Sequence, residues 1–388
     1  MRLLVVSYKN CWPIDPGERL YGTDGGFPFQ MKALSELFDE THLCLPCTSR
    51  NGAAGEIPLR GHNLKVVPLS TPGGTGIWRK LGIPIWMARS GATIVREMWR
   101  ADAVHAPIPG DIGTVGMLLA YLMRKPLFVR HCGNWFVQKT TAEHFWKWFM
   151  EKFAGGRNVM LATGGSAQPP SRQNPNLRWI FATSMTSNEL LEAAPQNKTI
   201  DRSVRLIIIC RQEMEKGTGV VIESLPLIRK QFPQATLDVV GDGSALARFK
   251  QLAEALGVNE QITFHGKVDH SGVSRLLREA DVFCFPTTSS EGFPKVVVEA
   301  LAHGLPVVTT KVSVLPLLIS SGCGTLIAKA EPTELAQAIV DILVDRDRYS
   351  QMSAQAVDTA QQYSLERWRD SIGDLLRSAW GRQLRSDT

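Results

Sequence analysis

Short runs of β-branched and other apolar residues alternate with longer segments of helical period along the whole 388-residue chain. That alternation is typical of parallel sheets covered by helices, so the predicted fold class is α/β. The expected strands are residues 3–7, 41–45, 64–68, 103–106 and 127–130 in the first half, and 205–210, 236–241, 262–265, 282–286, 306–309 and 324–327 in the second.

A stretch of different composition separates the two series of strands. Residues 167–201 are rich in Pro, Gln, Asn and Ser and contain one clear apolar run, which is typical of a connecting segment. We expect two Rossmann-like, doubly wound domains that face each other across a cleft, with ligands at the carboxyl ends of the strands. The predicted parts are an N-terminal domain over 1–182 on the acceptor side, a linker over 183–204, a nucleotide-sugar-binding domain over 205–365 and a terminal helix over 366–388.

The terminal segment, residues 365–384, is predicted to form an amphipathic helix, because its apolar residues recur every three or four positions. The sequence does not indicate which part of the chain covers the apolar face. The residues of that face are Trp368, Ile372, Leu375, Leu376, Ala379 and Trp380.

The charge of the chain is unevenly distributed: residues 1–182 carry a formal net charge of +9 and residues 183–388 one of −3. A basic half of this kind predicts an anionic partner, such as a membrane surface or an anionic substrate. No helix-turn-helix, zinc-finger or RNA-binding signature accompanies the basic residues, so no nucleic acid partner is expected. The composition, 44% hydrophobic and 21% charged, excludes disorder, collagen and coiled coil.

The cysteines and the start of the chain predict a reducing, cytoplasmic compartment, because neither a disulfide spacing nor a signal peptide is recognisable. No apolar stretch is long enough to span a bilayer. Cys44 and Cys47 form one C-x-x-C without a second ligand pair, and the D-x-D of Asp345 and Asp347 is expected to be a helix boundary. No metal and no cofactor are therefore expected.

The strongest motif runs from Glu291 to Glu299, E-G-F-P-K-V-V-V-E, after an expected strand and a polar loop. It opens a helix with Pro294 in the first turn, and a helix N-terminus suits a phosphate or another anion. The two carboxylates can accept hydrogen bonds from sugar hydroxyls. The alternative is that Glu291 caps the helix and that Glu299 is a solvated helix position.

A second motif follows the strand at 205–210, where Arg211 and Lys216 lie five residues apart and Gly217 precedes a helix expected near Thr218. Two cations at the carboxyl end of a central strand can converge on one diphosphate. Each cation alone could be a solvated surface residue. Together with the helix after Glu291, they predict a site for a nucleotide diphosphate that carries a sugar.

The order and spacing of these motifs resemble the retaining glycosyltransferase family 4, the glycosyl transferases of group 1 with the GT-B fold. The resemblance is dense over 205–365 and thin over 1–182. The motifs that carry it are Arg211-x4-Lys216-Gly217, Gly241-Asp242-Gly243, Phe264-His265-Gly266, Ala280-Asp281-Val282 and Glu291-Gly-Phe-Pro-x4-Glu299-Ala-x-Ala-x-Gly304-x-Pro306.

The resemblance implies a role for each matching residue. Arg211 and Lys216 would bind the diphosphate, and Glu299 the ribose. Glu291, which would bind the donor sugar, and His131, which would lie near it, are the expected catalytic residues; a structural histidine at a strand end is the alternative for His131. The remaining donor-binding residues are implied to be Gly25 and Gly26, a glycine loop close to the diphosphate, and the backbone cradle of Gly292, Phe293, Pro294, Lys295 and Val296.

The resemblance also implies a metal-independent, retaining hexosyltransferase. Arg211, Lys216 and the helix dipole would stabilise the charge that develops on the leaving diphosphate. We favour attack on the same face as the leaving group, with the departing phosphate taking the proton of the acceptor. The chain departs from the family where Ser313, Val314 and Leu317 replace the common Gly, Gly and Glu.

The acceptor is expected on the basic half. Residues 144–153 combine five aromatic residues with two lysines, and further Trp and Arg residues lie between 78 and 100. This composition is typical of a helix in a membrane interface, although a core helix with a solvated face would also explain it. The hypothesis is that the protein lies peripherally on the inner face of the cytoplasmic membrane. There it would extend a saccharide, expected to be lipid-linked, for cell-surface polysaccharide or glycolipid synthesis.

Two other function classes are alternatives to a glycosyltransferase. A non-catalytic GT-B scaffold or nucleotide-sugar-binding protein is the alternative that the altered segment at Ser313–Leu317 favours. A nicotinamide oxidoreductase is excluded, because no G-x-G-x-x-G follows the first strand.

Overall fold

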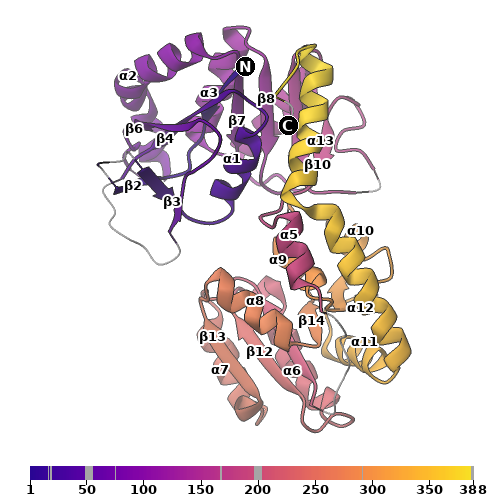
Figure 1. Ribbon diagram of the computed structural model, residues 1–388. Coiled ribbons are helices and arrows are strands. Elements are labelled where there is room, and N and C mark those ends of the chain that lie inside the picture. The colour runs from indigo at the N-terminus through magenta and orange to yellow at the C-terminus, as the bar shows by residue number, and fades with distance from the viewer. Residues whose placement is uncertain are drawn as a thin grey trace. The chain divides into compact units, whose positions relative to one another are not determined.

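The computed structural model describes residues 1–15, 17, 20–48, 56–74, 76–166, 168–195, 203–290 and 292–385. The chain divides into two compact units (Figure 1). The first unit comprises Met1–Gly164, Gln168–Ser184 and Leu365–Thr388, and the second comprises Gly165–Ala167 and Met185–Ser364. The first unit therefore includes both the beginning and the final helix of the chain.

The first unit is built on a seven-stranded parallel sheet with the order β10-β9-β8-β7-β1-β4-β6. A small antiparallel sheet, β2-β3-β5, lies beside it in the same unit. The strands are β1 (Arg2–Val6), β2 (Trp12–Asp15), β3 (Leu20–Thr23), β4 (Glu40–Pro46), β5 (Ile57–Pro58), β6 (Leu64–Leu69), β7 (Ala103–Ile108), β8 (Leu127–His131), β9 (Asn158–Thr163) and β10 (Arg178–Ile180).

Helices cover both faces of this sheet. α2 (Gly76–Arg100), α3 (Asp111–Leu122) and α4 (Thr141–Phe153) share one apolar core with it. α1 (Phe27–Ser35) and α13 (Leu365–Trp380) share the core on the other face. The terminal helix thus packs on the N-terminal unit, which the sequence did not indicate.

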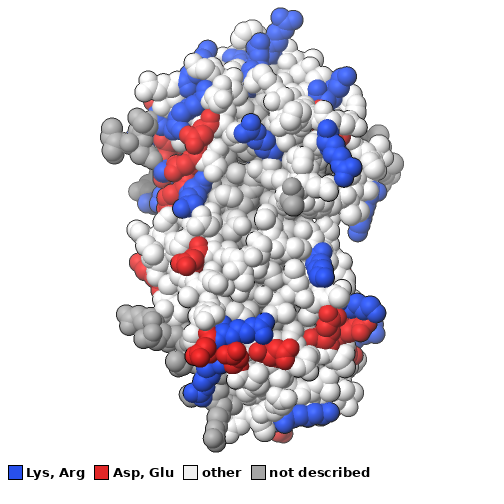
Figure 2. Space-filling model, turned by 90° about the vertical axis from the view of Figure 1, so that its right-hand side faces the viewer, with Lys and Arg blue, Asp and Glu red and all other residues white. Residues whose placement is uncertain are grey.

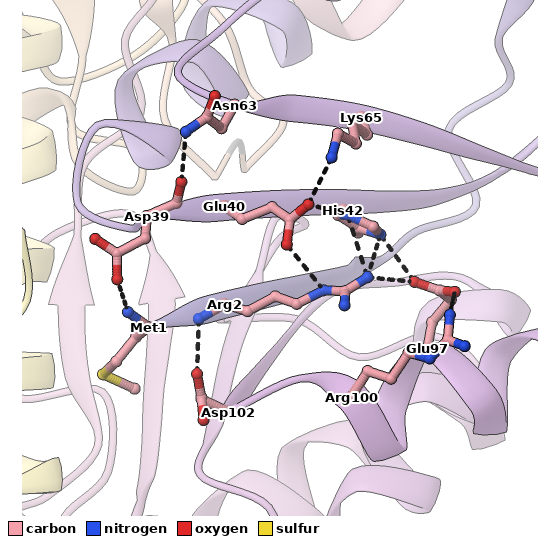
Figure 3. Close-up of polar contacts among 10 residues, drawn as sticks. All are labelled: Met1, Arg2, Asp39, Glu40, His42, Asn63, Lys65, Glu97, Arg100 and Asp102. Atoms are coloured by element: carbon pink, nitrogen blue, oxygen red, sulfur yellow. Dashed lines mark hydrogen bonds and ion pairs between the residues drawn. The ribbon is translucent and has the colours of Figure 1, made fainter.

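A network of charged residues joins α2 to the amino ends of three neighbouring strands (Figure 3). The Glu97 carboxylate of α2 accepts a hydrogen bond from Arg2 of β1 (2.9 Å) and lies 2.8 Å from Nδ1 of His42 on β4. Lys65 of β6 donates to Glu40 of β4 (2.7 Å). Because ligands of such sheets bind at the carboxyl ends of the strands, we interpret this network as structural.

The second unit is built on a six-stranded parallel sheet with the order β13-β12-β11-β14-β15-β16. Its strands are β11 (Arg205–Ile209), β12 (Thr236–Val240), β13 (Ile262–Gly266), β14 (Val282–Phe285), β15 (Val307–Thr310) and β16 (Gly324–Ile327). Its helices are α5 (Ser187–Ala193), η1 (Met214–Lys216), α6 (Thr218–Ile228), α7 (Leu246–Ala255), η2 (Asn259–Gln261), α8 (His270–Glu279), α9 (Lys295–Ala302), α10 (Leu315–Leu318), α11 (Pro332–Leu343), α12 (Arg346–Ala360) and η3 (Gln361–Tyr363).

Two apolar cores hold the second unit together, one on each face of the sheet. α6, α7 and α11 pack on one face. α5, α8, α9 and α10 pack on the other, and α12 contributes residues to both cores. The α/β class predicted from the sequence is confirmed, and each expected strand coincides with an observed one.

The differences from the sequence expectations are local. The segment predicted as a linker, 183–204, contains the short helix α5. A capping box between Thr186 and Glu189 stabilises the N-terminus of this helix. Strands β2, β3, β5, β9 and β10 were not expected. Asp345 is the N-cap of α12 and its side chain accepts from the Arg348 backbone N–H (3.0 Å), as expected for a helix boundary.

Figure 2 shows the side of the molecule on which α11 and α12 lie in Figure 1. Basic and acidic side chains are interspersed there with wide uncharged areas. Within the described part of the chain, no helix is both long and apolar enough to cross a bilayer.

The packing of α13 gives a first prediction. Trp368 is fully buried, and the Arg130 guanidinium of β8 lies 5.0 Å from the centre of its ring. Trp368→Ala would leave a cavity and remove the aromatic partner of a buried cation, so we expect a loss of about 3–5 kcal/mol in unfolding free energy. Urea denaturation followed by circular dichroism measures it. The exposed Ser378→Ala is the control on the same helix, and an equal midpoint for both variants would contradict the expectation.

Candidate functional site

The predicted donor-binding residues of the second unit follow two neighbouring strands, β11 and β14. The two strands pair in parallel, with Leu206 opposite Val282 and Ile207 opposite Phe283. Their carboxyl ends therefore meet at the same edge of the sheet. The loops that carry Lys216 and the start of α9 lie side by side for this reason.

Direct contacts join these two loops. Lys216 is buried, and its Nζ donates a hydrogen bond to Oγ of Ser289 (3.0 Å). The Thr288 backbone N–H donates to the Glu215 carbonyl (2.9 Å). Gly217 adopts a left-handed conformation, with φ of 89°, and an added Cβ would lie 2.4 Å from the Pro286 carbonyl oxygen. Glycine is required here, because both the backbone conformation and the close approach exclude a side chain.

Gln212 organises the loop after β11, and no role was predicted for it from the sequence. Its side chain is fully buried and donates to the carbonyls of Cys210 (3.1 Å) and Val240 (3.0 Å). Its Oε1 accepts from the Thr218 hydroxyl (2.8 Å). The side chain thus links β11, β12 and the first residue of α6. Its position inside the R-x4-K motif was the only sequence signal.

Arg211 extends from the same loop into solvent. The residue is exposed, and its guanidinium forms no hydrogen bond or ion pair with any residue that the structure describes. Hydrogen bonds from Ser244 lower the pKa of the neighbouring Glu213, and the charges of Arg211 and Lys216 add to this effect. Both predicted cations therefore lie on the loop after β11, and the Arg211 guanidinium is available to an anion.

The helix that carries Glu299 begins one residue later than expected. α9 starts at Lys295, and Pro294 is its N-cap residue rather than part of its first turn. Proline has no N–H to contribute, so the cap suits it equally well. Gly292, Phe293 and Val296 are partly buried, whereas Glu291 lies outside the described residues.

Glu299 is the acid that the structure places in a pocket. The pocket has a volume of about 250 Å³ and lies between α5, α8 and α9. Burial raises the pKa of Glu299, and the charges of His270 and Lys295 only partly oppose this. Its carboxylate accepts no hydrogen bond from a described residue, so it is free to accept from a ligand hydroxyl. The lining residues are Met185, Glu189, Glu192, Ala193, His270, Ser271, Val273, Ser274, Leu277, Arg278, Glu299 and His303.

The remaining predicted residues belong to the first unit. His131 ends β8, and burial lowers its pKa to about 4, so the imidazole is neutral at neutral pH. Its ring lies edge-on to Trp135, with the centres 5.3 Å apart. Gly25 has a φ of 69° and Gly26 is the N-cap of α1, so the glycine pair does form the turn that opens a helix.

Comparison with known proteins supports the family resemblance. Residues 191–359 match the model of glycosyl transferases group 1. This part of the chain is similar to the group 1 glycosyltransferases. The family resemblance seen in the sequence is thereby confirmed.

Two curated relatives of this chain are mycobacterial mannosyltransferases. The phosphatidyl-myo-inositol mannosyltransferase of Mycobacterium leprae is 34% identical over 174 residues, which are 43% of this chain and 46% of that protein. The aligned part thus spans less than half of that relative. The GDP-mannose-dependent alpha-(1-6)-phosphatidylinositol monomannoside mannosyltransferase of Mycobacterium tuberculosis is 28% identical, over 75% of this chain and 80% of that protein.

Solved structures with the same fold include Anabaena HepE in complex with UDP and the lipopolysaccharide glycosyltransferase WaaG. HepE superposes with a TM-score of 0.72 at 18% identity and covers 97% of this chain and 100% of its own. WaaG superposes with a TM-score of 0.64 at 15% identity and covers 97% and 99%. The GT-B fold expected for a group 1 glycosyltransferase is confirmed.

The setting of Glu299 gives a prediction that separates binding from stability. Glu299→Gln removes a charge that burial disfavours, so we expect it to raise the urea midpoint at neutral pH while weakening nucleotide binding by about tenfold or more. Because burial raises the pKa of Glu299 in the folded protein, the stability advantage of Glu299→Gln over wild type should grow as pH rises from the ordinary carboxyl range through that raised pKa. The advantage should vanish below the ordinary carboxyl range, where both side chains are neutral.

Calorimetric titration with UDP and GDP, and urea unfolding at several pH values, measure the two effects. Glu254→Gln, an exposed position on α7, is the matched control. Unchanged nucleotide affinity in Glu299→Gln would contradict the assignment of this residue to ribose.

Proposed function

We propose that the protein is a retaining glycosyltransferase that moves a hexose from a nucleotide-diphosphate donor to a saccharide acceptor. The observation that carries this proposal is the edge where β11 and β14 end. The loops after these strands carry two cations and the N-terminus of α9, and one turn along α9 lies Glu299, whose carboxylate accepts no hydrogen bond from a described residue. These groups match a diphosphate and a ribose in charge and hydrogen bonding. HepE, which has the same fold, binds UDP, and this likeness supports a nucleotide donor.

In the proposed mechanism Arg211 and Lys216 hold the diphosphate. As the bond between the sugar and the phosphate breaks, negative charge develops on the leaving oxygen, and the two cations and the N-terminus of α9 stabilise it. The acceptor oxygen attacks the same face of the sugar, and its proton passes to the departing phosphate. These groups supply the positive charge that the leaving group needs, which supports a reaction without a metal.

Glu291 and His131 are proposed to contact the donor sugar, and Gly25 and Gly26 to approach the diphosphate. His131 is neutral at neutral pH, so it can donate or accept a hydrogen bond without opposing the positive charge that develops on the sugar. The backbone of Gly292, Phe293, Pro294, Lys295 and Val296 is proposed to cradle sugar and phosphate at the start of α9.

Lys216, the cation at the contact between the two loops, gives the main test of the activity. Lys216→Ala should lower kcat/KM for transfer by about 100- to 1000-fold, because the developing charge loses its nearest compensation. Donor hydrolysis and transfer, measured with a panel of nucleotide sugars, give the readout. Lys230→Ala, an exposed lysine on the same unit, is the control.

A non-catalytic scaffold that binds nucleotide sugars is the second candidate, and the altered segment at Ser313, Val314 and Leu317 favours it. The two candidates differ in one result. Wild-type protein that binds a nucleotide sugar, with binding lost in Lys216→Ala, but that turns over no donor in the panel would favour the scaffold.

The acceptor is proposed to be a lipid-linked saccharide, used in cell-surface polysaccharide or glycolipid synthesis. The curated mannosyltransferases named above act, by their names, on phosphatidylinositol lipids, which supports a lipid acceptor. The proposed location is the cytoplasm, at the inner face of the cytoplasmic membrane.

The outer sides of α2 and α4 support this membrane contact. Both helices pack on the same face of the first unit's sheet. Trp78, Trp99 and Trp148 are exposed by 73%, 71% and 54%, and Arg89 and Lys152 are exposed on the same helices. Large aromatic residues among cations are typical of a surface that enters the interface of an anionic membrane.

Vesicle flotation tests this surface. We expect binding to vesicles with anionic lipid, weaker binding without it, and a further loss of about fivefold for each of Arg89→Ala and Arg96→Ala, since a basic residue near such a surface contributes about 1 kcal/mol. Lys230→Ala in the second unit should bind like wild type. Equal absence of binding to both kinds of vesicle would refute the membrane contact.

A further inference from the structure

The second unit contains another hollow, at the segment where the chain departs from its family. Ser313 has a φ of 54°, a left-handed conformation at a position where the family commonly has glycine. Val314 is buried, and Leu315 and Leu318 of α10 pack into the core. Leu317 is left pointing outward, with 44% of its surface exposed. The replacement of the family's Glu therefore places an apolar side chain at the surface.

Leu317 lines a groove between α10 and the end of α12. The groove has a volume of about 420 Å³, which falls in the range of small-molecule sites. Every lining residue belongs to the second unit. They are Leu317, Ser320, Ser321, Gln355, Asp358, Thr359, Gln362 and Tyr363.

The chemistry of the lining points to a neutral ligand rich in hydroxyl groups. Hydroxyl, amide, phenol and carboxylate groups make up the lining apart from Leu317, and they can both donate and accept hydrogen bonds. Among the described residues that line it there is no Lys or Arg, so a phosphate or another anion would meet no opposite charge. Leu317 and the Tyr363 ring provide apolar surface for the C–H groups of a sugar ring.

Part of the groove wall is fixed by hydrogen bonds within the protein. The hydroxyls of Ser321 and Thr359 lie 2.6 Å apart, and the Ser320 hydroxyl donates to the Leu317 carbonyl (2.9 Å). In the orientation that satisfies both ends of its amide, Gln355 donates to the carbonyl of Gly322 (2.9 Å). A fixed wall lowers the conformational entropy that the protein loses when a ligand binds, because fewer side chains must be ordered.

Asp358 lies at the rim and provides the strongest acceptor. It is exposed, and its carboxylate forms no hydrogen bond or ion pair with any residue in the part of the chain that the structure describes. It can accept from two neighbouring hydroxyls of one sugar ring. The groove also reaches the donor-binding loop, since the Tyr363 ring packs against Phe293 with the centres 5.4 Å apart.

We propose that this groove is a binding site for a neutral oligosaccharide, separate from the nucleotide site at β11 and β14. Leu317 and Tyr363 form its apolar floor, and Asp358 and Gln355 form its polar rim. The choice of a glycan as ligand rests on the proposed function, but binding requires neither donor nor turnover. The site would hold a segment of the acceptor glycan or of a product chain.

The test is binding of neutral oligosaccharides to the full chain without nucleotide, followed by saturation-transfer NMR and calorimetric titration. Linear glucan, mannan and galactan oligosaccharides of increasing length are the probes, with the corresponding monosaccharides as a second arm. We expect saturable binding to at least one oligosaccharide and weaker binding to its monosaccharide. Excess UDP or GDP should not displace the glycan.

Variants locate the binding. Asp358→Ala and Leu317→Ser should each weaken oligosaccharide binding by about fivefold or more, because each removes one contact of the ring. Gln351→Ala, an exposed glutamine on α12 outside the groove, should bind like wild type. All three positions are exposed, and circular dichroism checks that the variants fold.

Two results would overturn the proposal: no oligosaccharide in the series saturates the wild-type protein, or the groove variants bind as tightly as Gln351→Ala. Failure of the proposed function is seen separately. In that case no nucleotide binds and no donor turns over, whereas glycan binding and its loss in the groove variants persist.

Discussion

The parallel pairing of β11 with β14 is the constraint on which the candidate site depends. Parallel neighbours end at the same edge, so loops that are far apart in sequence are brought together there. Gly217 allows the two loops to touch, since its backbone passes the Pro286 carbonyl at a distance that excludes a Cβ. The Lys216 contact with Ser289 then fixes one cation beside the start of α9. Positions of charge at this edge follow from backbone pairing rather than from side-chain packing.

Two charged groups at the site, Arg211 and Glu299, form no salt bridge with a described residue. Arg211 has no acidic partner among the described residues, and the Glu299 carboxylate has no donor among them, although burial makes its charge unfavourable. A buried charge such as that of Glu299 reduces stability unless a ligand compensates for it. This differs from the network around Glu97, where Arg2 and His42 satisfy the buried carboxylate. The contrast separates a binding site from a structural cluster of similar composition.

Sequence reasoning predicted those features that depend on local pattern. The strands that precede Arg211 and Glu291 were predicted because their apolar runs end in turn residues, and the α6 start at Thr218 because Gly217 precedes it. Gln212 was missed, since its role depends on the carbonyl of Val240 in another strand. The site roles of Glu291, His131 and the other candidates stay predictions, and Glu291 lies outside the described residues.

Features that depend on contacts between distant segments were not predictable in the same way. The helix α13 was expected, but its partner was not, because the contact of Trp368 with Arg130 joins the last helix to a strand in the first half of the sequence. The small sheet of β2, β3 and β5 has short strands with few apolar residues, so it lacks the alternation that marks a strand. The helix α5 did leave a signal, the S/T-x-x-E pattern of Thr186 and Glu189, which the polar composition around it concealed.

The formal charge of the basic half overstates the number of cations that are available to a partner. Arg2 and Lys65 are paired with Glu97 and Glu40, and Arg79 with Asp111. These three cations contribute to the count from the sequence but have opposite charges beside them. On α2, Arg96 and Arg100 lie 3.9 Å and 3.7 Å from the carboxylate of the buried Glu97, whereas the exposed Arg89 has no acidic partner among the described residues. The distribution of acids therefore identifies the basic surface better than the net charge of the half does.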